Sequence, residues 1–88
     1  MISETDRKKI ESIAKKYNVS MVILFGSAAE SDIAEDIDLA VKGIDKRIFF
    51  RFYAELFKNL SKPVDLVDLS VKSLFNDIIE KNGIKIYG

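Results

Sequence analysis

The N-terminal part of the chain carries apolar side chains at the spacing of an amphipathic helix. The positions that share this face are Ile10, Ile13, Ala14 and Tyr17. Ser3 and Asp6 precede them with the spacing of a capping box, in which side chains satisfy free N–H groups of the first turn. The pattern predicts a helix over residues 3–17 that ends at Asn18.

Two strand-like segments follow this helix. Residues 20–25 are almost entirely apolar. In residues 36–42 polar and apolar side chains alternate, so that Asp36 and Asp38 share the face opposite the apolar one. Both segments are therefore predicted to be β-strands, and Gly43 is expected to close the second.

The second half of the chain repeats the helix and strand patterns. The expected elements are a helix over residues 45–60, a strand over residues 64–67 that Pro63 precedes, a further helix after Ser70, and a short edge strand over residues 84–87. The apolar positions of the further helix are Val71, Leu74, Phe75, Ile78 and Ile79. Ser70 is predicted to cap this helix, and Gly83 to end it in a left-handed conformation.

The order of these elements predicts an α/β (α+β) fold, a small mixed β-sheet flanked by helices, in a single domain over residues 1–88. A strand, a helix and a second strand form a right-handed parallel crossover, so the strands 36–42 and 64–67 should start at the same end of the sheet. If the strand 20–25 is antiparallel to its neighbour, its C-terminal end lies there too.

Composition excludes several classes of function. The chain has no histidine and no cysteine, so it cannot contain a Ser/His/Asp triad, a thiolate nucleophile or a His/Cys zinc site. Its 14 basic and 14 acidic residues cancel, which argues against nucleic acid or an anionic membrane as a partner. No apolar stretch approaches the roughly 20 residues of a membrane span and no signal peptide opens the chain, so we expect a cytoplasmic protein.

Three carboxylates and one turn carry the candidate chemistry. Asp36 and Asp38 are about 6.6 Å apart along a strand, which suits metal ions held roughly 3.5 to 4 Å apart. The predicted topology brings Asp65 and the turn Gly26-Ser27 to the same sheet end. Magnesium prefers such oxygen ligands and leaves positions open for substrate phosphates, and Asp65 is the candidate to accept a proton from an attacking hydroxyl.

Simpler interpretations of the same residues stay open. A lone Asp-x-Asp is most often a solvated strand end, and a Gly-Ser pair is most often only a turn. Ser27 and Glu30 have the spacing of a capping box, so the serine can simply start a short helix. That interpretation is compatible with a phosphate site, because a helix N-terminus attracts anions.

The segments Gly26-Ser27, Asp36-Ile37-Asp38 and 63–69 resemble the minimal nucleotidyltransferases of the DNA polymerase beta superfamily, and the resemblance covers nearly the whole chain. It implies the nucleotidyltransferase fold and a magnesium-dependent transfer of a nucleoside monophosphate from ATP or another NTP. The residues it assigns to catalysis and to the metal are Asp36, Asp38 and Asp65, and those it assigns to the nucleotide are Gly26 and Ser27.

The resemblance also implies a partner. Minimal nucleotidyltransferases are commonly paired with small helical HEPN-domain proteins as toxin and antitoxin, and some silence the toxin by adding AMP to a tyrosine. An 88-residue chain has no separate domain to grip an acceptor, so a protein acceptor that brings its own surface fits best. The expected activity is therefore transfer of AMP to a hydroxyl of a HEPN-type partner.

Two departures from the family pattern support an alternative. Eight residues, 28–35, separate Ser27 from Asp36, fewer than the family usually has, and Glu30 stands where many members have arginine. The alternative is a catalytically degenerate binding module that neutralises its partner by direct contact. The complete set of three acids favours the enzyme.

The helix 45–60 is a candidate interface for a partner or for a second copy of the chain. Its apolar side chains cover an arc of roughly 160°, wider than the roughly 100° of one buried stripe. Phe50 and Phe57 on one edge, or Phe52 on the other, are the expected contacts. The alternative is a thick core helix, since small domains use aromatic residues for packing.

Overall fold

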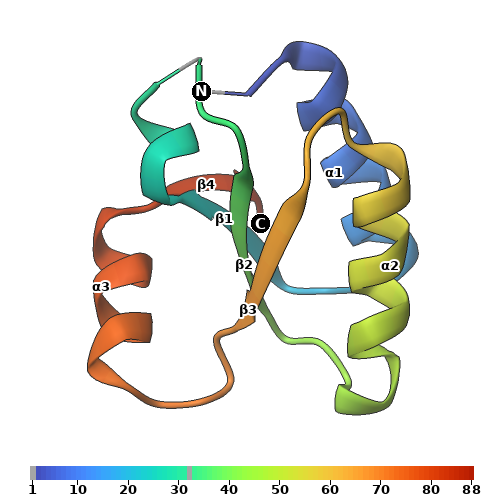
Figure 1. Cartoon of the computed structure of the whole chain (residues 1–88). Helices are drawn as coiled ribbons and strands as arrows, with labels where there is room; N and C mark the ends of the chain where they lie inside the picture. Colours follow the sequence, from blue (N-terminus) through green and yellow to red (C-terminus); the bar gives the residue numbers. More distant parts are fainter. Residues whose placement is uncertain (1, 32) are drawn as a thin grey trace.

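The computed structural model describes residues 2–31 and 33–88 of the chain. In chain order its elements are α1 (Glu4–Lys16), β1 (Met21–Phe25), the 3-10 turn η1 (Gly26–Ala29), β2 (Ile37–Lys42), the 3-10 turn η2 (Lys46–Ile48), α2 (Phe49–Asn59), β3 (Val64–Asp68), α3 (Leu74–Asn82) and β4 (Ile84–Tyr87). Figure 1 shows α1 and α2 on one side of the sheet and α3 on the other. The predicted α+β architecture is confirmed.

The four strands form one mixed sheet in the order β3-β2-β1-β4. β1 is antiparallel to β2 and to β4, whereas β2 and β3 are parallel. The predicted parallel crossover and the C-terminal edge strand are thus confirmed. The first strand is antiparallel to its neighbour, which meets the condition for its C-terminal end to lie beside the start of β2. Asp36, predicted to be the first residue of this strand, lies just before β2 instead.

The main core lies between the sheet and the pair α1 and α2. Its largest fully buried side chains include Phe52, Ile10, Leu39 and Leu56. A smaller cluster of Ile23, Ala40, Leu69 and Ile79 packs α3 against the opposite face. Because β-strand side chains alternate between faces, Asp38 and Asp65 project toward the α3 side, in step with Ala40 and Val67.

The start of α1 follows the predicted capping pattern only in part. The Ser3 hydroxyl accepts a hydrogen bond from the Asp6 N–H at 3.1 Å, as expected of an N-cap. The buried Asp6 carboxylate instead accepts hydrogen bonds from the backbone N–H and the hydroxyl of Ser61. Asn18, with φ 60°, ends the helix as predicted.

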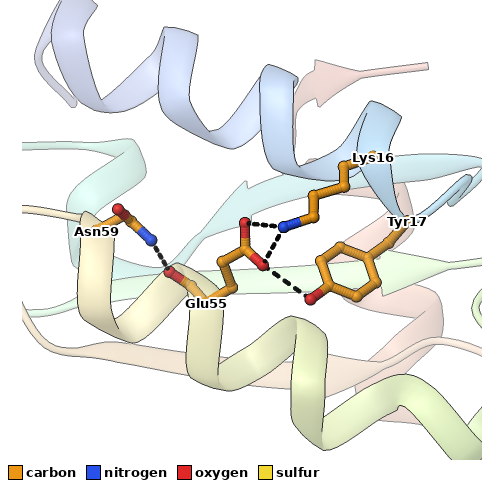
Figure 2. A network of polar contacts seen from close by, with 4 residues as sticks. All are labelled: Lys16, Tyr17, Glu55 and Asn59. Carbon is orange, nitrogen blue, oxygen red and sulfur yellow. Dashed lines mark hydrogen bonds and ion pairs between the residues drawn. The ribbon is translucent and has the colours of Figure 1, made fainter.

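A polar network joins the exposed edges of α1 and α2 (Figure 2). The Glu55 carboxylate accepts hydrogen bonds from Lys16 Nζ at 2.9 and 3.0 Å and from the Tyr17 hydroxyl at 2.8 Å. Asn59 Nδ2 donates to the Glu55 carbonyl oxygen at 2.7 Å. These hydrogen bonds lower the pKa of Glu55 and raise those of Lys16 and Tyr17.

The prediction for the start of α3 was wrong. Ser73, not Ser70, is the N-cap, and its hydroxyl accepts from the Asn76 N–H at 3.1 Å. The chain between them is held as a loop because buried Asn76 donates its amide to the carbonyl oxygens of Asp68 and Val71. Val71 therefore lies in this loop instead of on the helix.

The prediction of a left-handed Gly83 was also wrong, since its φ is −74°. Glycine is needed there for another reason: a Cβ atom would lie 2.8 Å from the Ile79 carbonyl oxygen and 3.1 Å from that of Leu24. The α3–β4 junction thus passes closely over β1. Within the described part of the chain, no helix is both long and apolar enough to cross a membrane.

Candidate functional site

The predicted acidic residues gather at one end of the sheet. Asp38 on β2 is the register partner of Asp65 on β3 and of Phe25 on β1. Asp36 comes two residues before Asp38, and Gly26 directly follows Phe25. The structure therefore places the three carboxylates and the Gly26-Ser27 turn side by side, as the topology required.

The backbone conformation and the surroundings of Gly26, next to the Asp38 carboxylate, both favour glycine. Its φ is +71°, a conformation that L side chains rarely adopt. The atom that a Cβ at this position would meet first is Asp38 Oδ2. Any larger residue would displace the carboxylate, so glycine allows the turn to sit directly on Asp38.

Asp38 is the least exposed of the three acids. Burial raises its pKa, and the charges of Asp65 and Asp36 raise it further. Asp36 and Asp65 are exposed, whereas Asp38 is partly buried. The result is a concentration of negative charge that a cation would stabilise.

The donors at this sheet edge are of the chemical kind that a divalent cation takes. Across residues 2–31 and 33–88, no three acidic side chains converge closely enough to hold a metal ion by themselves. Like-charged carboxylates repel one another, and a bound cation would offset that repulsion. The donors are carboxylate oxygens, which magnesium prefers, and they belong to neighbouring strands with a fixed register.

The predicted capping box at Ser27 was wrong. The 3-10 turn begins at Gly26 after the extended Phe25, with no side chain capping it, so Ser27 already lies inside the turn. Glu30 ends the turn, and its N–H donates to the Ser27 carbonyl oxygen at 3.1 Å. Ser27 and Glu30 are both exposed on the turn that follows β1.

Lys62 is a residue at the site that sequence analysis missed. Its Nζ donates to the Ala34 carbonyl oxygen at 2.6 Å, which holds the connection leading into Asp36. The Ile37 N–H donates to the Pro63 carbonyl oxygen at 2.8 Å and fixes the start of β2 against β3. In the sequence, the sole indication of this role is that Lys62 stands next to Pro63, directly before the strand β3. Asp32, in the same connection, lies outside the described residues.

The family model for the polymerase beta nucleotidyltransferase domain matches residues 8–88. A search of curated proteins gives no match. The matched range covers nearly the whole chain, including the turn and the three acids of the sheet edge.

Several solved structures share the fold. A toxin–antitoxin structure with AMP-PNP has a TM-score of 0.75 and 26% identity, over 93% of this chain and 73% of that one. A tri-AMPylated HEPN toxin in complex with an MNT antitoxin, from Shewanella oneidensis, has a TM-score of 0.72 and 26% identity, over 94% and 70%. An MntA-HepT toxin–antitoxin structure has a TM-score of 0.73 at 24% identity, over 98% and 73%, and shows likeness of fold alone.

Proposed function

The chain belongs to the polymerase beta nucleotidyltransferase family, in its minimal nucleotidyltransferase branch, and from this premise we propose that it transfers AMP from ATP to a hydroxyl of a protein partner. The observation that carries the proposal is the register that pairs Asp38 with Asp65 beside the Gly26 turn. Magnesium is commonly bound through one or two carboxylates together with substrate phosphates, and two carboxylates on adjacent strands beside a tight turn offer such donors.

Each residue has a role in this proposal. Asp36, Asp38 and Asp65 hold magnesium, and Gly26 and Ser27 hold the triphosphate. Magnesium, when bound, supplies positive charge that offsets the charge of the phosphates. The acceptor hydroxyl oxygen forms a bond to the α-phosphorus while the bond to the β-phosphate oxygen breaks, and pyrophosphate leaves. Asp65, exposed at the strand edge, accepts the proton of the hydroxyl.

The partner in this proposal is a small helical HEPN-type protein. The chain itself supplies one sheet and three α-helices within the described residues, all of them used to build the fold and the candidate site. An acceptor must therefore present its own hydroxyl to the sheet edge. The AMPylated HEPN toxin in complex with an MNT antitoxin supports the choice of partner and of AMP.

A degenerate binding module is the second candidate function. The observation that favours it is the exposed acid Glu30 at the end of the phosphate-side turn, three residues after Ser27. A negative charge there opposes a polyphosphate. Such a protein would neutralise its partner by contact without modifying it.

The decisive experiment mixes the purified protein with a HEPN-type partner, magnesium and each NTP in turn, and measures the partner by mass spectrometry. The expected result is a gain of one adenosine monophosphate with ATP, lost in Asp65→Asn. Asp68→Asn is the matched control, because asparagine keeps the oxygen that accepts from the Ser70 N–H. A tight complex with no change of mass under saturating ATP supports the binding module instead.

A further inference from the structure

An open groove of about 540 Å³ lies between α3 and the turn that follows β1. Phe75 and Ile78 of α3, with Phe25 of β1, give it large apolar walls. Polar groups are contributed by Ser27, Glu30 and Asn82, among others. Figure 1 shows α3 and the turn η1 on the same side of the sheet. This size and this mixture of aromatic walls with few polar groups are typical of small-molecule sites.

The apolar walls of the groove are unusually open to solvent. Phe75 is 55% exposed and Ile78 is 49% exposed, one helical turn apart. The Phe75 ring packs edge-to-face against Phe25, with ring centroids 6.0 Å apart. One side of the Phe75 ring is thus held in place while much of its surface stays available for a flat ligand.

The groove begins where the acidic site ends. Phe25 is the register partner of Asp38, and Gly26, which lies against Asp38 Oδ2, also lines the groove. A ligand whose phosphates lie at the carboxylates and the turn therefore has its other end directed along α3. The groove itself is lined by no lysine or arginine, so it suits a neutral group and not the phosphates.

We infer that this groove holds the base of the nucleotide, with Phe75 and Ile78 as the surface against which the base stacks. The inference rests on the proposed function, since it extends the same phosphate site. On the groove, the Glu30 carboxylate is an acceptor, and the Asn82 amide offers both an acceptor and donors. Adenine, guanine and cytosine carry an exocyclic amine that such acceptors recognise, whereas uracil does not. The Glu30 carboxylate therefore favours amino-bearing bases in this groove.

The test compares three probes by calorimetry: magnesium with ATP, with UTP, and with tripolyphosphate, which has no base. The wild-type protein should bind ATP several-fold more tightly than UTP or tripolyphosphate. Phe75→Ala should weaken ATP binding about tenfold, because stacking of one base on an aromatic ring is lost. It should leave tripolyphosphate binding unchanged. Ile78→Ala, a second and milder variant, should act in the same direction.

Phe57→Ala is the matched control, because Phe57 is 53% exposed but lies on α2. It should change none of the three affinities. Equal wild-type affinity for the three probes, or unchanged ATP binding in a folded Phe75→Ala protein, overturns the base groove and leaves the phosphate site standing. Weaker partner binding by Phe75→Ala with unchanged ATP binding overturns it in favour of a protein contact. If the wild type binds none of the probes, the proposed function fails and this inference fails with it.

Discussion

Asp38 and Asp65 face each other across the parallel strands β2 and β3, as register partners on the same side of the sheet. Like charges placed directly opposite on neighbouring strands destabilise a sheet. The pKa of Asp38 is raised accordingly, first by burial and then by Asp65 and Asp36. The pair is therefore a local strain on the fold that a bound cation would relieve.

Replacing both Asp36 and Asp38 with asparagine should abolish magnesium-dependent ATP binding, because two of the three oxygen donors lose their charge. Calorimetry of ATP with and without magnesium measures the effect. Asp68→Asn, at the far end of β3, should leave the magnesium dependence intact. Unchanged magnesium dependence in the double variant would remove these aspartates from the site.

Asp38→Asn should raise the melting temperature of the metal-free protein. A carboxyl whose folded pKa is raised is destabilising when charged, so the penalty is present at neutral pH and disappears as the pH falls through the folded pKa. The gap between variant and wild type should therefore be widest near pH 7 and shrink in acid. Thermal unfolding followed by circular dichroism across this range tests the sign. A wild type more stable than the variant at pH 7 without metal contradicts the prediction.

The network around Glu55 gives the opposite dependence on pH. Hydrogen bonds from Lys16 and Tyr17 lower the pKa of Glu55 below its ordinary 4.5, so its contribution is present above that value and is lost as the pH falls through the folded pKa. The raised pKa values of Lys16 and Tyr17 mean that their contributions are lost at alkaline pH.

Glu55→Gln should accordingly lower the melting temperature at neutral pH and have little effect in acid. Glu80→Gln is the control, because Glu80 forms a single ion pair with Lys42 and has no tyrosine partner. Its effect at neutral pH should be smaller. Equal effects of the two substitutions would show that the α1–α2 network (Figure 2) adds nothing to an ordinary surface pair.

Most of the helices and strands were predictable because they depend on local periodicity. The strand alternation placed Asp38 on the face opposite Leu39, and the helix between β2 and β3 set their parallel direction. The gathering of the acids at one end of the sheet was therefore predictable from the sequence. The start of α3 did not, because Ser70 and Ser73 have similar capping chemistry and the choice between them depends on the buried amide of Asn76. The hydrogen bonds between Asp6 and Ser61 likewise join residues far apart in the chain.

Helix α2 shows the same difference between features set by the local sequence and features set by tertiary packing. The wide apolar arc correctly indicated that Phe50 and Phe57 are exposed, at 78% and 53%. Phe52 was wrongly expected at the other edge: it is fully buried, because α2 turns this side chain into the core between α1 and the sheet, where its ring packs edge-to-face against Tyr17. The direction in which a helix faces its core is a tertiary property.

Replacing both Phe50 and Phe57 with serine should leave the free energy of unfolding within about 0.5 kcal/mol of the wild-type value. Phe52→Ala should lower it by about 3 to 5 kcal/mol. Chemical denaturation measures both. If the exposed edge is an interface, the double serine variant should also reduce self-association or partner binding, followed by size in solution. Collapse of folding in the double variant, with no assembly ever detected for the wild type, would mean that these residues serve the core.

Glu30 provides the last prediction, that its charge weakens the binding of triphosphate. At about 6 Å and an effective dielectric constant near 20, one repulsive pair of unit charges costs roughly 3 kcal/mol before salt screening, which reduces it considerably. Because Ser27 lies inside the turn and no side chain caps it, substitutions at Glu30 do not remove a cap. Tripolyphosphate is the probe, since it lacks a base and reports the charge alone. Glu30→Gln should tighten its magnesium-dependent binding, and Glu30→Arg should tighten it further, with the largest gains at low salt. If neither variant binds tripolyphosphate more tightly at low salt, the Glu30 carboxylate points away from the phosphates and does not inhibit the site.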